Sequence, residues 1–125
     1  MSSRRLIVND RTGQVVLARA RVCASFVSRL IGLNFQGSRS INEGALFVRG
    51  SPSRLGTAIH TLALRSSIGV VWLDAQLRVV DKKLAESWTF AHVPAARAMY
   101  YLEAEPSVLE RVEIGDQLRI TEAVS

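Results

Sequence analysis

His60 carries the side chain best suited to proton transfer near neutral pH, because an imidazole gains and loses its proton in that range. Arg65 and Asp74 follow in the same stretch of sequence. An imidazole near a guanidinium can act as a general base or contact an anion. Catalysis also needs a nucleophile, an orienting group or a metal, and none stands at a recognisable spacing. The pattern indicates a binding residue, with an ordinary structural or exposed histidine as the simpler interpretation.

A second group of polar and aromatic residues follows further along the chain. Trp88 and Phe90 are two positions apart and would project to one face of an extended segment. They could form the floor of a pocket or stack on a base, although aromatic residues at this spacing more often belong to a core. His92 and His60 have no paired carboxylate nearby, which is a poor pattern for zinc. We expect no metal and no cofactor, and we place a small-ligand site at His60, Arg65, Trp88 and His92.

Familiar catalytic patterns are absent from the sequence. No phosphate-cradling glycine loop, dinucleotide fingerprint or nucleophile elbow occurs. Cys23 is the only cysteine, so no intrachain disulfide can form, and its apolar neighbours indicate an inert buried thiol. Four carboxylates form no pair suited to acid–base work: Asp81, Glu86, Glu103 and Glu105. We therefore expect a non-enzymatic accessory domain that binds a small ligand or a protein partner, and we rank an enzyme with a loop-borne site last.

The charged residues are unbalanced toward the basic side. The 125-residue chain has 16 Lys and Arg against 11 Asp and Glu, a formal net charge of +5, and such a field attracts polyanions and acidic partners. Arg4, Arg5, Arg19 and Arg21 belong to two segments expected to pair, so they could line one edge of a hairpin. They support the alternative hypothesis, weak electrostatic binding of nucleic acid or another polyanion. Aromatic residues make up only 6% of the chain, which disfavours base stacking, and a solvated basic face is the simpler interpretation.

Short β-like runs separated by turn residues must position these side chains. The sequence predicts one mainly β domain over residues 1–125, a compact barrel or sandwich with two short helices. No apolar run is long enough for a membrane span, and the N-terminal run is too short for a signal peptide, so we expect a cytoplasmic protein. The predicted elements are a hairpin of Leu6–Val8 with Gln14–Val22, a helix Phe26–Leu33, a strand Ala45–Val48, a loop Gly50–Thr57, a strand Ile59–Leu64, a hairpin of Val70–Leu73 with Leu77–Asp81 that turns at Asp74, a strand Ala98–Glu103, a helix from Pro106 to about Val112, and a strand Gln117–Thr121.

Several of these pieces occur together in a characteristic order. They are Ser28–Leu33, Glu43–Leu46, Ile59–Asp74, Leu77–Val80, Ala96–Glu103 and Ile114–Leu118. From about Val15 to Ile120 the ordered set resembles the prokaryotic family called domain of unknown function 192. The resemblance implies a compact β-rich fold with short helices, and it implies no activity, because the family's function is not established.

The chain departs from the family pattern at several positions. Members similar to it usually carry an aromatic residue at Leu62, Met at Leu64, Phe-Pro at Ser66 and Ser67, and Asp at Gly69. That acidic residue would be a natural anchor for a polar site. Gly69 cannot act as an acid, a base or a ligand, so a family site at this position is weakened or altered in this chain.

Overall fold

The computed structural model describes residues 4–23, 44–53, 68–85 and 98–123. All described strands belong to one sheet of seven strands in the order β5-β4-β6-β3-β2-β1-β7, which confirms the mainly β prediction. Every neighbouring pair is antiparallel except β2 and β3, which run parallel. The elements are β1 Arg4–Asn9, β2 Val15–Cys23, β3 Ala45–Ser53, β4 Ile68–Leu73, β5 Val79–Ala85, β6 Ala98–Ala104, the 3-10 helix η2 Pro106–Arg111, and β7 Leu118–Glu122.

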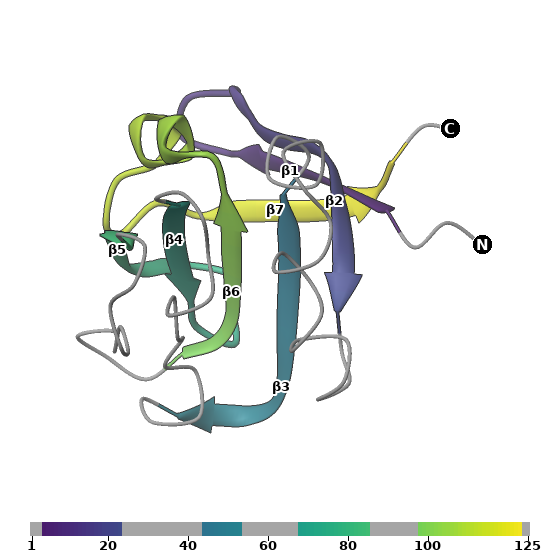
Figure 1. Cartoon of the computed structure of the whole chain (residues 1–125), viewed down its shortest axis with the longest axis vertical. Coiled ribbons are helices and arrows are strands. Elements are labelled where there is room, and N and C mark those ends of the chain that lie inside the picture. The colour runs from purple at the N-terminus through teal and green to yellow at the C-terminus, as the bar shows by residue number, and fades with distance from the viewer. Residues whose placement is uncertain (1–3, 24–43, 54–67, 86–97, 124–125) are drawn as a thin grey trace.

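The two outer strands of the sheet approach each other, so the sheet curls toward a barrel (Figure 1). An isolated bridge joins Arg78, just before β5, to Gln117, just before β7. The Leu118 N–H donates to the Leu77 carbonyl at 3.0 Å, and the Val79 N–H donates to the Asp116 carbonyl at 2.8 Å. These bonds satisfy backbone groups that an open sheet edge would leave unpaired.

Local turn chemistry explains both predicted hairpins. Asn9 ends β1, and its side-chain oxygen accepts the Arg11 N–H at 3.0 Å. Asp74 ends the β4 side of the second hairpin, where its carboxylate accepts the N–H groups of Gln76 and Arg78, each at 2.9 Å. Short polar side chains that bond the backbone ahead of them are typical of such turns. The predicted turn at Asp74 is confirmed.

The sheet carries a buried apolar cluster on each face. The inner face holds Ile7, Val16, Leu17, Ala20, Leu46, Val71, Leu73, Val79, Leu102, Ala104 and Leu118, and Val108 and Val112 at η2 complete that cluster. The outer face of β3, β4 and β6 holds a second cluster of Ala45, Phe47, Ile68, Val70, Trp72, Ala98 and Tyr101. All six residues of β4 are buried, which confirms the prediction of a central strand at Val70–Leu73.

Two predictions about local structure need correction. Gly50–Ser53 continues β3 instead of forming a loop, with an irregular register before Ser53. The alternation of Gln14–Val22 predicts that Val16, Ala18, Ala20 and Val22 share one face. A bulge interrupts the pairing of β2 with β1, so Val16 and Leu17 are both buried and Ala18 is exposed. The helix predicted from Pro106 is confirmed, as the 3-10 helix Pro106–Arg111.

The predicted helix Phe26–Leu33 and strand Ile59–Leu64 lie outside the described residues. Within the part of the chain that the structure describes, no helix has the length and apolar character needed to cross a membrane.

Candidate functional site

The predicted small-ligand site lies outside the described residues. His60 and Arg65 fall within residues 54–67, and Trp88 and His92 within 86–97, neither of which the structure describes. The proposal for these four side chains therefore stays a prediction.

Gly69, where the family resemblance implies an acidic residue, is closely packed on its inner side. Gly69 lies in β4, beneath η2, and a Cβ built there would lie 2.6 Å from Cγ1 of Val108. The same Cβ would lie 3.2 Å from the carbonyl oxygen of Glu105. A larger side chain would have to displace η2, so the absence of an acid at this position is coupled to how η2 packs.

Three of the four predicted polyanion contacts share one face of the first hairpin. Arg4 of β1 stands directly opposite Arg21 of β2, so their side chains project to the same side. Arg19 precedes Arg21 by two residues and is exposed, which places it on that side as well. The Arg4 guanidinium donates to the Arg19 carbonyl at 3.3 Å. We call Arg4, Arg19 and Arg21 the arginine face.

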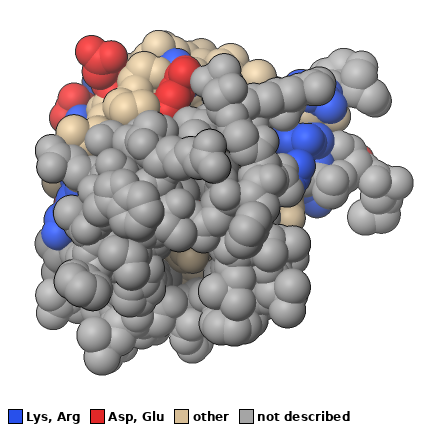
Figure 2. Space-filling model, in the orientation of Figure 1, with Lys and Arg blue, Asp and Glu red and all other residues tan. Residues whose placement is uncertain are grey.

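The surface view agrees with this register. Figure 2 shows Lys and Arg atoms gathered on the side of the molecule where β1 begins. Arg5 stands apart, because it lies opposite Ala20 in β2 and opposite Glu122 in β7.

A fifth arginine of the first hairpin has a structural role. Arg11 donates from Nε to the Asp116 carboxylate at 2.6 Å and from Nη2 at 3.0 Å. Asn9 donates to the same carboxylate at 2.7 Å, and the Glu113 N–H donates at 2.8 Å. The hydrogen bond from Arg11 lowers the pKa of Asp116 well below its usual range, against the opposing effect of burial. This network joins the turn after β1 to the turn that precedes β7.

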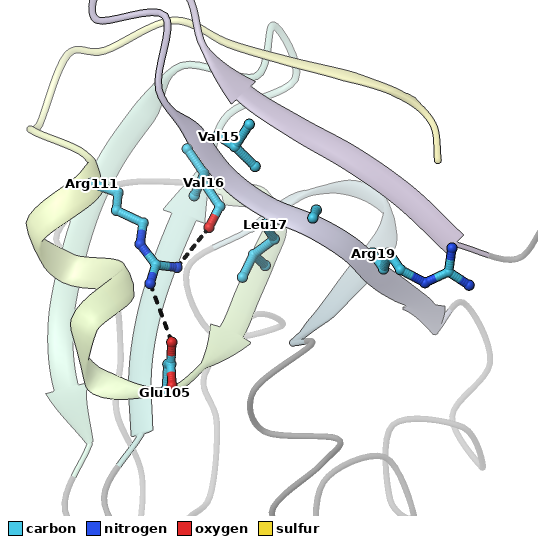
Figure 3. A pocket seen from close by; sticks show the side chains of 7 residues that line it. Val15, Val16, Leu17, Arg19, Glu105 and Arg111 are labelled. Atoms are coloured by element: carbon cyan, nitrogen blue, oxygen red, sulfur yellow. Dashed lines mark hydrogen bonds and ion pairs between the residues drawn. The ribbon is translucent and has the colours of Figure 1, made fainter. Parts of the chain in front are cut away.

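A groove of about 430 Å³ runs beside β2 (Figure 3). Arg111 lines it, donating from Nη1 to the Val16 carbonyl at 2.9 Å and from Nη2 to Glu105 at 3.2 Å and to Ser107 at 3.1 Å. Because these bonds engage the guanidinium, Arg111 acts as a strut between η2 and β2. Arg19 also lines this groove, and its side chain extends away from the Arg111–Glu105 pair (Figure 3).

Glu103 is a buried polar residue whose burial the sequence did not predict. Its position in β6 places it between Ala45 of β3 and Val70 of β4 on the outer face of the sheet. Only 9% of the residue is exposed, and this burial raises the pKa of its carboxyl to about 8. A glutamate inside an otherwise apolar strand was the available signal, but the sequence does not show that both faces of that strand are buried.

The described residues provide no group of three or more His, Cys, Asp or Glu side chains that could hold a metal. What these residues present is an arginine face, a groove that Arg19 helps to line, and a buried carboxyl at Glu103.

Comparison with other proteins identifies relatives of uncharacterised function. The sequence model of the family DUF192, described as Uncharacterized ACR, matches residues 7–120. A UPF0127 protein of Thermococcus sibiricus is 32% identical over 115 residues, covering 90% of this chain and 73% of that protein. A UPF0127 protein of Pyrococcus furiosus is 30% identical over 114 residues, covering 90% of this chain and 95% of that protein.

Two solved structures share the fold at low sequence identity. A protein of unknown function from Novosphingobium aromaticivorans has a TM-score of 0.76 at 16% identity, covering 93% of this chain and 83% of that one. A Sinorhizobium meliloti protein described as a "putative transcription regulator" has a TM-score of 0.78 at 15% identity, covering 95% of each chain. At these identities the likeness shows the fold alone.

Proposed function

The chain belongs to DUF192, a family of uncharacterised function. We propose, from the geometry of the chain itself, that it is a non-enzymatic binding module whose arginine face contacts the phosphate backbone of a nucleic acid. The observation that carries this proposal is the cross-strand pair of Arg4 and Arg21, with Arg19 on the same side. Guanidinium groups gathered on one side of a hairpin attract a chain of phosphates.

Arginine is suited to this contact because its planar fork donates two parallel hydrogen bonds to phosphate oxygens. The backbone that carries Arg4 is held by a side-chain contact, since the Arg5 guanidinium donates to the Arg4 carbonyl at 2.9 Å. We assign the three arginines to phosphate contacts, which carry no sequence information, so binding is expected to depend on charge and to be independent of sequence. Duplex DNA is the first polyanion to test, in view of the description given to the Sinorhizobium meliloti protein.

The test is a binding titration of a labelled 20-base-pair duplex at low salt, with neutral glutamine replacing one arginine at a time. Arg19→Gln and Arg21→Gln are expected to weaken binding several-fold each. Arg119→Gln is the matched control, because Arg119 is exposed on β7 and pairs with Asp10 at 3.7 Å, outside the arginine face. Equal losses in all three variants would show attraction by net charge only and would contradict a dedicated face.

A small-ligand site at His60, Arg65, Trp88 and His92 is the second candidate. The observation that favours it is the pairing of Ile68 with Ala85. Arg65 precedes Ile68 by three residues and Trp88 follows Ala85 by three, so both segments meet the sheet at adjacent strand ends. Small-molecule library screening by NMR tests this candidate, and a ligand whose affinity is unchanged in His60→Ala and Arg65→Ala would remove it.

A further inference from the structure

The groove beside β2 and the arginine face share one residue. Arg19 belongs to the arginine face and also lines the groove, as do Val15, Ala18 and Glu105. Figure 3 shows the Glu105–Arg111 pair near Val16, and Arg19 further along β2. On the proposed function, a phosphate chain held by the arginine face passes directly beside the groove.

The groove has room for a small group but not for a double helix. Its volume of about 430 Å³ falls within the range of roughly 300–1,000 Å³ that is usual for small-ligand sites. Val16 and Arg19, three residues apart, are separated by at most about 10 Å of strand, which is the length scale of a single nucleotide. A duplex, whose major groove alone is about 12 Å wide, cannot enter. A nucleic acid can therefore fill the groove only with an unpaired nucleotide.

Irregular pairing opens the sheet at this groove. The register of β1 against β2 shifts between Arg5 and Ile7 and again between Ile7 and Val8. On its other side β2 pairs with β3 over Arg21–Cys23, so within the described chain Val15–Ala20 has no strand partner there. Bulges are over-represented beside active sites, where they redirect side chains. The bulged part of β2 is the part that lines the groove.

The lining of the groove suits a nucleobase. Val15 is 45% exposed and Ala18 is exposed, and flipped-out bases pack against apolar side chains in protein pockets. The Glu105 side chain is 36% exposed, and its Oε1 accepts from Arg111 at 3.2 Å, which offsets the negative charge beside a phosphate chain. A carboxylate accepts hydrogen bonds at about four sites and donates none, so its ligand must present an N–H group. Every base has such a group on its pairing edge, where a duplex already uses it.

From these observations we infer that the groove receives an unpaired base of a nucleic acid whose phosphates lie on the arginine face. Arg19 holds the phosphate next to that base, Val15 and Ala18 contact the ring, and Glu105 accepts an N–H from the pairing edge. The preferred ligand is therefore a single strand, with little preference among bases. This inference rests on the proposed function, because the phosphate contacts bring the strand to the groove.

The test compares two strands that have the same number of phosphates. One is a single-stranded DNA of twelve nucleotides with mixed bases, and the other is an abasic strand of the same length. In anisotropy titrations at low salt, the wild-type protein is expected to bind the base-bearing strand about tenfold more tightly. Equal affinities would overturn the inference and leave the phosphate contacts standing. No binding of either strand would overturn the proposed function as well.

Variants place the base contact in the groove. Ala18→Leu adds a bulky side chain at the groove lining, and Glu105→Ala removes the acceptor. In both variants the ratio of the two affinities is expected to fall toward one, while binding of the abasic strand persists. Ala75→Leu is the matched control, because Ala75 is exposed in the turn after β4, and it should keep the wild-type ratio. Amide spectra verify that each variant is folded. A wild-type ratio in either Ala18→Leu or Glu105→Ala would contradict the site.

Discussion

Arg11 and Asp116 are joined by two hydrogen bonds, at 2.6 and 3.0 Å, between residues 105 positions apart in sequence. The Asp116 side chain is 4% exposed and that of Arg11 is 56% exposed, so a buried carboxylate is held by a cation at the surface. This pair fixes the first turn of the chain against the segment that leads into β7. It also explains why Arg11 is not part of the arginine face.

Asp116 is expected to make the protein sensitive to acid. Its pKa is lowered in the folded state, so its contribution to stability is complete above the carboxyl's unfolded pKa and is lost as the pH falls through the folded value. Asp116→Asn should cost about 1–3 kcal/mol at pH 7, because hydrogen bonds to a charged group are lost. Urea denaturation of both proteins at pH 7 and pH 3 measures this. A gap between the two proteins that does not narrow at pH 3 would contradict the assignment.

Glu103 is expected to have the opposite pH dependence. Its pKa is raised in the folded state from 4.5 to about 8, so the folded chain holds a proton that the unfolded chain releases between these values. Stability should therefore fall as the pH rises from about 4.5 to 8, by roughly 5 kcal/mol at most. Above the folded pKa the loss should be complete.

The glutamine variant isolates this effect. Glu103→Gln cannot ionise, so its free energy of unfolding should vary less between pH 5 and pH 8 and should exceed that of the wild type at pH 8. Glu105→Gln serves as the control, because Glu105 is half-buried and paired with Arg111 at 3.2 Å, and it should keep the wild-type trend. An identical pH trend in Glu103→Gln and the wild type would show that Glu103 titrates normally.

Gly69 is expected to tolerate no side chain. Even the Cβ of Gly69→Ala would lie 2.6 Å from Val108 and 3.1 Å from Leu109, and overpacking of this kind costs about 1–3 kcal/mol. Gly69→Asp should cost more, because it would add a carboxylate beneath η2. Thermal unfolding of the two variants measures the costs, with Gly115→Ala as a control at a site where nothing lies within 4 Å but φ is +96°. A stable Gly69→Asp variant would show that η2 moves easily.

Local signals were sufficient to predict much of the sheet. The turn at Asn9 and the backbone-bonding Asp74 mark two hairpins through chemistry that acts within a few residues. Pro52 misled the prediction for Gly50–Ser53, because proline and glycine are typical of loops, whereas β3 accommodates them beside a register irregularity. The bulge in β2 likewise has no clear signature in its sequence.

Residues whose roles depend on topology could not be predicted. Glu103 looks like the solvent-facing member of an alternating strand until β6 is known to lie between β3 and β4. The Arg11–Asp116 pair depends on contact between distant turns. The arginine face depends only on the register of the first hairpin, so the sequence could place Arg4, Arg19 and Arg21 together. It could not separate Arg5 from them, because that residue's place opposite Ala20 and Glu122 depends on how β1 pairs with both neighbours.

The salt dependence of duplex DNA binding tests the proposed function most directly. Each arginine that neutralises a phosphate contributes about one unit to the slope of log affinity against log salt concentration. The Arg19→Gln/Arg21→Gln double variant should therefore bind more weakly, with a slope shallower by about two units, while Arg119→Gln keeps the wild-type slope. An unchanged slope in the double variant, or no binding of the wild type at low salt, would contradict the proposal that the arginine face contacts the phosphate backbone of a nucleic acid.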